Sequence, residues 1–208
     1  MRLIKMTSSQ KVPDRWYAEF ENGERLRVNT ALIADFSLFS GREMDADEFD
    51  ALKNSTEREG AKARALNILG TRSMSCAEIK ERLLSKGESE VCAQETVGWL
   101  EKNGFVNDSE YSKMLARHYA AKGYGRAKIK DELYRRGIAR DMWDEALSAV
   151  PEQDGTIDAL IEKKLCGGKP DRAEAAKITA YLRRRGFSWE EIRSALERYG
   201  ARTEENYE

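Results

Sequence analysis

The residues best suited to chemistry in this chain are cations that recur at a fixed spacing. Lys128 and Arg135 are seven residues apart, and so are Lys177 and Arg184. Two residues seven apart on an α-helix project within about 20° of each other, so each pair would lie along one flank of one helix. Such a flank fits an acidic partner, either the phosphates of DNA or an acidic protein surface. Neighbouring cations extend the two pairs: Arg126, Lys130 and Arg136 in the first case, Arg183 and Arg185 in the second.

A solvated surface is the alternative explanation for these cations. Asp131 and Arg135 are four residues apart and would form an ordinary surface ion pair on a helix. An earlier stretch of the same layout has Glu78 and Ser85 at the two positions, so two stretches share the pair and the third does not. We favour the acidic partner because the pair recurs at one register in both stretches.

Catalytic and metal-binding patterns are weak. The single histidine, His118, stands alone on an expected helix, whereas acid–base work needs a partner held in place. The three cysteines form no Cys-x-x-Cys pair. Gly167-Gly168-Lys169 resembles the end of a phosphate loop, but Pro170 stands where Ser or Thr must bind magnesium, and Gly123-x-Gly125 lacks a third glycine. We therefore predict no catalytic residue, no cofactor, no metal and no enzymatic activity.

The elements that must position the cations form a threefold repeat. The pattern Ile-x-x-x-Leu-x-x-x-Gly occurs at 79–87, 129–137 and 178–186, with starts 50 and 49 residues apart. Ile and Leu four apart share one face of a helix, and the Gly suits the left-handed residue that ends it. A cation precedes each Gly (Lys86, Arg136 and Arg185), where it would complement the helix dipole. This periodicity is typical of helical repeat proteins, which usually present binding surfaces.

Each copy of the pattern belongs to a unit of three helices. An apolar residue ten positions after each Gly anchors a following helix, and a further helix precedes each copy. Capping patterns begin at Ser75, Asn107, Asp171 and Ser188. We predict an all-α fold, an elongated tandem array of three-helix repeats at 61–104, 105–150 and 154–200, with a frayed tail at 201–208.

Residues 1–60 have a different character, that of a β-hairpin followed by short helices. The strand-forming runs 15–20 and 25–28 flank Asn22-Gly23, which is a strong hairpin signal. A lone hairpin is marginal in water, so Trp16, Phe20, Leu26 and Val28 should pack on the first helices or on a partner; we favour the first helices. One helix is expected at 30–39 and another from Asp45, with a polar junction at 54–60.

Composition limits the cellular setting. The net charge is −1 and 35% of the 208 residues are charged, so any contact with nucleic acid must be a local stripe. The first residues contain no apolar run of signal-peptide length, and no later run approaches a membrane span. We expect a cytoplasmic protein without a membrane partner.

With the repeats laid out, the chain resembles the RecX family of recombination regulators along nearly its whole length. The middle repeat carries the strongest match, and the third departs most, through Cys166-Gly167-Gly168-Lys169. The matching residues of the middle repeat are Phe105-Val106-Asn107-Asp108, Tyr111, Arg117, Gly123, Gly125, Ile129, Glu132-Leu133 and Gly137-Ile138. Those of the first repeat and its surroundings are Ala65, Leu69, Ser75, Glu78, Leu83, Gly87, Val97, Leu100, Gly104, Gly41, Met44 and Asp47-Glu48-Phe49.

The resemblance implies a function without catalysis. Such proteins bind the RecA recombinase filament on single-stranded DNA and alter its ATPase, strand-exchange and coprotease activities, for which we expect inhibition. The implied fold is an elongated series of three-helix units, and we expect a monomer. Two alternatives stay open: a helical module that binds DNA directly, and a helical adaptor for another protein.

Overall fold

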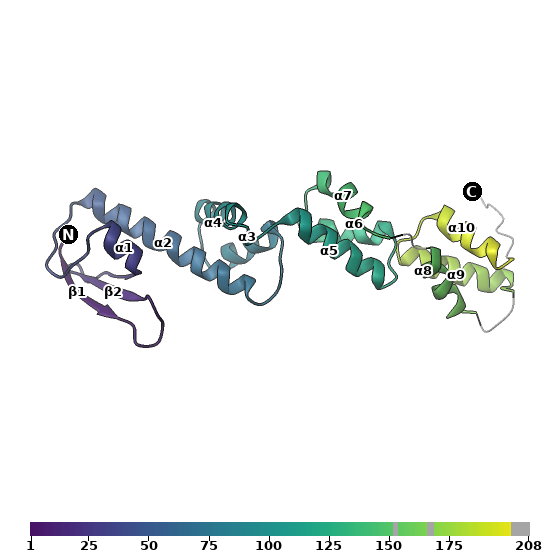
Figure 1. Cartoon of the computed structure of the whole chain (residues 1–208), viewed down its shortest axis with the longest axis horizontal. Coiled ribbons are helices and arrows are strands. Elements are labelled where there is room, and N and C mark those ends of the chain that lie inside the picture. Colours follow the sequence, from purple (N-terminus) through teal and green to yellow (C-terminus); the bar gives the residue numbers. More distant parts are fainter. Residues whose placement is uncertain (152–153, 166–168, 201–208) are drawn as a thin grey trace. The chain divides into compact units, whose positions relative to one another are not determined.

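The computed structural model describes residues 1–151, 154–165 and 169–200 (Figure 1). The chain divides into two compact units. Met1–Arg72 and Ile79–Phe105 form the first unit; Ser73–Glu78 and Val106–Glu208 form the second. The predicted fold class is confirmed, since the chain is mostly helical, with tandem three-helix repeats and a small N-terminal sheet. The elongation of the array stays a prediction. The expected tail at 201–208 and the residues Cys166, Gly167 and Gly168 lie outside the described residues.

The sheet has three antiparallel strands in the order β1-β2-β3: Leu3–Ser8, Trp16–Phe20 and Arg25–Val28. The predicted hairpin is β2 and β3, joined through Gly23, whose φ of 82° needs a residue without a Cβ. Strand β1 is an addition to the prediction. It pairs with β2 from Leu3↔Phe20 to Ser8↔Trp16 and so gives the hairpin the third strand that it needs for stability.

The hairpin packs inside the chain, as favoured from the sequence. Ala18, Phe20 and Val28 are buried in one cluster with Phe49 and Leu52, and the rings of Phe20 and Phe49 meet edge to face at 4.8 Å. Helix α1 (Thr30–Asp35) is shorter than the expected 30–39. It ends early because Phe36 caps it and Ser37 takes a φ of 47°, a left-handed conformation that stops an α-helix.

A single helix, α2 (Ala46–Leu69), leads from the sheet into the first repeat. It begins at Asp45, as predicted, where the carboxylate accepts a hydrogen bond from the backbone N–H of Glu48 at 2.8 Å. Residues 54–60, expected as a polar junction, are helical. The early part of α2 buries Phe49 and Leu52 and its later part buries Ala61 and Ala65, so tertiary packing at both ends holds the polar middle in the helix.

The repeats follow the predicted order of helices. The first repeat combines the end of α2 with α3 (Cys76–Ser85) and α4 (Glu90–Lys102). The second consists of α5 (Asp108–Ala121), α6 (Arg126–Arg135), a short 3₁₀ turn η1 (Arg140–Met142) and α7 (Trp143–Ser148). The third consists of α8 (Asp154–Glu162), α9 (Arg172–Arg184) and α10 (Trp189–Arg198).

The repeated Ile-Leu-Gly pattern does what its spacing predicts. All three Ile and Leu pairs are buried, and the glycines 87, 137 and 186 have positive φ values of 89°, 69° and 88°. The second and third repeats have separate apolar clusters, so each of these two repeats has its own core. Among the described residues, no helix combines the length and the apolar character that crossing a bilayer requires.

Candidate partner interface

Helices α6 and α9 carry the predicted basic flank. In α6, Ile129 and Leu133 are buried, Arg135 is exposed and Lys128 is half-buried. In α9, Ile178 and Leu182 are buried in the same way, and both Lys177 and Arg184 are exposed. Helix α6 holds four cations and two carboxylates, and α9 holds four cations and one carboxylate, whereas α3 holds two of each. The second and third repeats therefore offer a basic helix that the first repeat lacks.

Most of the predicted cations form no ion pair with the residues that the structure describes. Within the described part of the chain, no ion pair involves Arg126, Lys128, Lys130, Lys177, Arg183 or Arg184. We call these six cations together with Arg135 the basic flank. Arg135 lies 3.2 Å from Glu132, not paired with Asp131, and its side chain is 69% exposed. An exposed pair of this kind is worth little, so Arg135 is also available to a partner.

Arg136 has another task, although the sequence places it among the predicted site residues. Its Nη1 donates to Glu78 Oε1 at 2.9 Å and to the Tyr111 hydroxyl at 3.2 Å. Burial disfavours charge on the guanidinium, but Tyr111 and Glu78 outweigh that cost and raise the pKa of Arg136 above its ordinary value. Arg136 thus ties α6 to the first turn of α3, and we leave it out of the basic flank.

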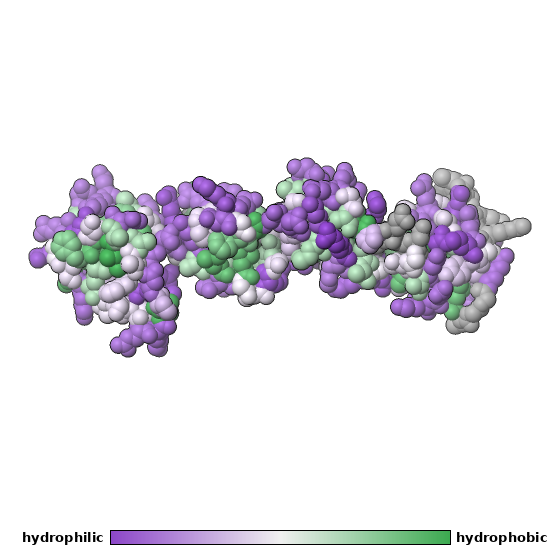
Figure 2. All heavy atoms as spheres, in the orientation of Figure 1, coloured by the Kyte–Doolittle hydropathy of each residue, from purple (hydrophilic) through white to green (hydrophobic). Residues whose placement is uncertain are grey.

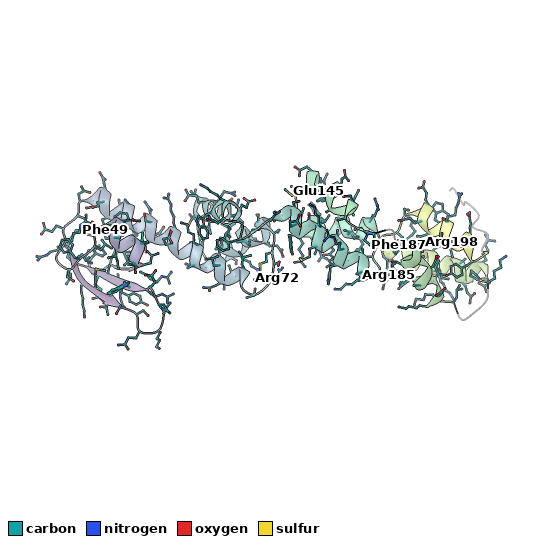
Figure 3. All side chains as sticks on the ribbon, viewed as in Figure 1. Phe49, Arg72, Glu145, Arg185, Phe187 and Arg198 are labelled. Atoms are coloured by element: carbon teal, nitrogen blue, oxygen red, sulfur yellow. The ribbon has the colours of Figure 1, made fainter. Side chains whose placement is uncertain are left out.

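Arg185 plays the same part between the next two repeats. Its Nη1 donates to the carbonyl oxygens of Lys122 and Gly123, both at 3.0 Å. Its guanidinium also lies 5.1 Å from the ring centre of Tyr124 and 5.0 Å from that of Tyr181. Figure 3 shows Arg185 between the bundle of α5–α7 and the bundle of α8–α10. Since it holds repeats together, Arg185 is also left out of the basic flank.

The backbone beside each of these arginines forms a contact that we call a joint. In a joint, the end of the middle helix of one repeat (α6 or α9) packs against the start of the middle helix of the preceding repeat (α3 or α6). The Arg185 and Gly186 carbonyls accept hydrogen bonds from the backbone N–H groups of Gly125 at 2.8 Å and Ala127 at 3.1 Å. A Cβ at Gly186 would lie 2.3 Å from the Lys128 backbone nitrogen. The close approach puts the last turn of α9, with Arg184, beside the first turn of α6, with Lys128.

A matching joint lies at the start of α3. The Ser75 hydroxyl donates to the Arg136 carbonyl, and a Cβ at Gly137 would lie 2.4 Å from the Cβ of Ala77. The sequence predicts Ser75 as a helix cap, and it is one, since it accepts from the Glu78 N–H at 3.1 Å. Gly125, noted in the sequence for an incomplete glycine loop and for the family resemblance, is the N-cap of α6 and leaves room for the incoming backbone.

Residues considered for catalysis lie apart from this flank. His118 is exposed on α5 and packs edge to face against Tyr119, with ring centres 5.7 Å apart. Among the described residues, no group of three His, Cys, Asp or Glu side chains is placed to hold a metal ion. Gly167 and Gly168 of the incomplete phosphate loop lie outside the described residues.

Comparisons with known proteins bear on the repeats. Residues 61–100, 107–147 and 152–196 match the family models described as the first, second and third three-helix domains of RecX. The chain is 34% identical over 142 residues to a protein of Pelodictyon phaeoclathratiforme named regulatory protein RecX, covering 66% of this chain and 87% of that one. It is 26% identical over 199 residues to the protein of that name from Caldanaerobacter subterraneus, covering 94% and 96%.

Two solved structures share the fold. A crystal structure titled regulatory protein RecX has a TM-score of 0.76 at 21% identity and covers 95% of this chain and 98% of its own. A RecX structure from Lactobacillus salivarius has a TM-score of 0.65 at 22% identity and covers 70% of this chain and 98% of its own.

Proposed function

Because the chain belongs to the RecX family of regulatory proteins, we propose that it regulates the RecA recombinase without catalysing a reaction. In this proposal it binds the RecA filament on single-stranded DNA and inhibits the ATPase, strand-exchange and coprotease activities of RecA. It acts in the cytoplasm as a monomer. Support comes from the resemblance of the repeats and from the names of the relatives, which call them regulatory proteins.

The observation that carries the proposal is the basic flank on two consecutive repeats. Lys177 and Arg184 on α9 are followed, across the joint, by Lys128 and Arg135 on α6. A filament on DNA offers acidic surfaces and phosphates at regular intervals, so cations on successive repeats would meet successive sites. Weak contacts of this kind add through effective concentration once the first has formed.

Charge reversal tests this proposal. The variant has Glu at Lys128, Arg135, Lys177 and Arg184; its matched control has Glu at four exposed cations elsewhere, Arg82, Lys86, Lys102 and Arg117. We expect the flank variant to need on the order of tenfold more protein for half-inhibition of RecA ATPase on single-stranded DNA. The control should inhibit like the parent. Equal inhibition by both variants, with unchanged circular dichroism, would remove the flank from the mechanism.

Sedimentation separates the RecA proposal from the first alternative. A RecA regulator should sediment with RecA–DNA filaments far more than with either component alone. A module that binds DNA directly would instead bind labelled DNA without RecA, with steep salt dependence in fluorescence anisotropy. The basic flank would serve that activity too, so the deciding observation is whether RecA on the DNA increases the binding.

The adaptor alternative has one observation in its favour. Figure 2 shows apolar residues gathered on the surface of the first unit. Several of its large apolar side chains are exposed, from Phe105 at 51% to Val91 at 67%; the others above half exposure are Ile4 and Phe39. Surfaces of this kind often contact proteins. Tight binding to a partner in the absence of RecA would favour the adaptor.

A further inference from the structure

A groove in the first unit is left unused by the proposed function. Its volume is about 720 Å³, within the range of pockets that hold a nucleotide-sized molecule. Its walls come from four places in the chain: the loop after β1, the end of β3, the second half of α2 and Trp99 on α4. All four belong to one compact unit, so the groove is a feature of that unit alone.

Two guanidinium groups converge on the floor of the groove. A Cβ on Gly60 would lie 3.1 Å from Arg27 Nη2 and 3.7 Å from Arg64 Nη2. Gly60 is in the interior of α2, where a glycine weakens a helix. Its missing side chain leaves the space in which Arg27 from β3 and Arg64 from α2 lie close together.

Positive charge is in excess in this groove. Its carboxylates are engaged: Asp14 accepts from the Thr30 backbone N–H at 2.8 Å, and Glu59 lies 2.7 Å from Lys62. Arg64 lies 2.9 Å from Glu88. Arg15 and Arg27 form no ion pair with any residue that the structure describes. An anionic ligand would supply the charge that is missing.

The lining of the groove also includes one aromatic side chain. Trp99 lines the groove, and Phe105 stacks on its indole ring with ring centres 5.4 Å apart. Lys62 Nζ lies 5.2 Å from the Trp99 ring centre, and Phe105 is 51% exposed. Cations that track a backbone beside rings that stack bases are the combination by which proteins hold single-stranded nucleic acid. An acidic peptide would use the cations and leave the rings unused.

We propose that this groove binds a short stretch of single-stranded nucleic acid, with a phosphate at Arg15 and Arg27 and a base against Trp99. A single strand is required because bases in a duplex are stacked on each other and cannot reach the ring. The site is separate from the basic flank, and it does not depend on RecA. Its test therefore contains no RecA, and failure here leaves the RecA proposal untouched.

The phosphate contact is tested with a fluorescently labelled oligothymidine and the full chain. The four-site flank variant is the background, so that residual binding reports on the groove. Adding Arg27→Gln should weaken binding on the order of fivefold. It should also make the negative slope of log K against log salt shallower by about 0.7, because one phosphate contact is lost. The control is Arg25→Gln on the same strand, because Arg25 is exposed, lies 3.5 Å from Glu19 and does not line the groove. Equal affinity of the two variants would overturn the proposal.

The base contact is tested by tryptophan fluorescence. Of the four tryptophans, only Trp99 lines the groove. Oligothymidine should quench the parent, Trp99→Phe should lose that quenching, and Trp143→Phe should keep it. An abasic oligonucleotide of equal charge should bind without quenching. Quenching that survives in Trp99→Phe, or duplex DNA or polyglutamate that binds as tightly as oligothymidine, would refute the proposed ligand.

Discussion

Gly87 and Gly186 occupy the same position in two repeats but have different surroundings. Both have φ near 90°, yet a Cβ at Gly87 would meet nothing within 4 Å, whereas one at Gly186 would collide with the backbone of Lys128. Gly87→Ala should therefore cost only the left-handed backbone penalty of about 1–2 kcal/mol. Gly186→Ala should cost about 3 kcal/mol or more, because the joint must also open. Urea unfolding followed by circular dichroism measures both, and equal losses would show that the joint adds nothing.

Two neighbouring arginines allow a second comparison. The ion pair of Arg136 with Glu78 leaves 27% and 15% of the two side chains exposed, while Arg135 is 69% exposed. Arg136→Gln should lower the free energy of unfolding by about 2 kcal/mol, since Glu78 and Tyr111 lose a half-buried charged partner. Arg135→Gln should cost less than about 1 kcal/mol. The reverse order in urea unfolding would contradict the role given to Arg136.

The sequence places Lys86, Arg136 and Arg185 at one register but does not separate their roles. Spacing alone makes all three helix-end cations, and two of them also look like parts of a basic stripe. Their partners, Glu78 for Arg136 and the Lys122 and Gly123 carbonyls for Arg185, are distant in sequence and come together only through the joint. The residue type was the one sequence signal that separates these roles. The guanidinium group of Arg can donate to several acceptors at once, whereas Lys86, which is exposed, has no such group.

Among the elements, α2 gives a prediction about its interior glycine. Gly60→Ala should raise the free energy of unfolding by up to about 1 kcal/mol, because the nearest atom to the new Cβ is the mobile end of Arg27. Gly98→Ala on α4 is the control, since its Cβ would meet nothing within 4 Å. Thermal unfolding of both variants decides the matter. A loss of stability confined to Gly60→Ala would mean that Arg27 is held rigidly against the helix.

The elements with a strong period were predictable, and those fixed by distant packing were not. The buried Ile and Leu of α3, α6 and α9 follow directly from helical spacing. In β1 the alternation of apolar and polar residues that marks a strand is interrupted, because the apolar residues Leu3 and Ile4 are adjacent. Leu3 is buried, whereas Ile4 is 58% exposed. The polar middle of α2 shows no apolar stripe, and its helical state depends on cores at its two ends.

For the whole molecule, ionic strength should control the proposed binding to the RecA filament. The basic flank holds six cations without an ion pair among the described residues. If all six contact phosphates of single-stranded DNA, log K should fall against log salt with a slope of about −4. Co-sedimentation with RecA–DNA filaments between about 50 and 200 mM salt measures that slope. An affinity that does not change with salt would indicate that other contacts hold the complex.

At the scale of the whole molecule, the order of the repeats and the family could be predicted from the sequence, because both depend on local patterns that recur. The contact between one repeat and the next could not be predicted, because the only sequence signal of a close backbone approach is a glycine. The sequence predicts Gly137 and Gly186 as ordinary helix ends and Gly125 as part of an incomplete glycine loop, yet a Cβ at any of them would lie within 2.4 Å of a neighbouring repeat or of the start of α3.

The joint has a consequence for how such a chain can grow. Helix α3 has a receiving end at Ser75, α9 has a donating end at Gly186, and α6 receives at Gly125 and donates at Gly137. Helix α6 has both, so a tandem duplicate of 105–150 would bring compatible ends to each new boundary. A chain lengthened by such a duplication would need no new contact surface. The two ends of α6 already fit the helices on either side, and the duplicate would form the same contacts again.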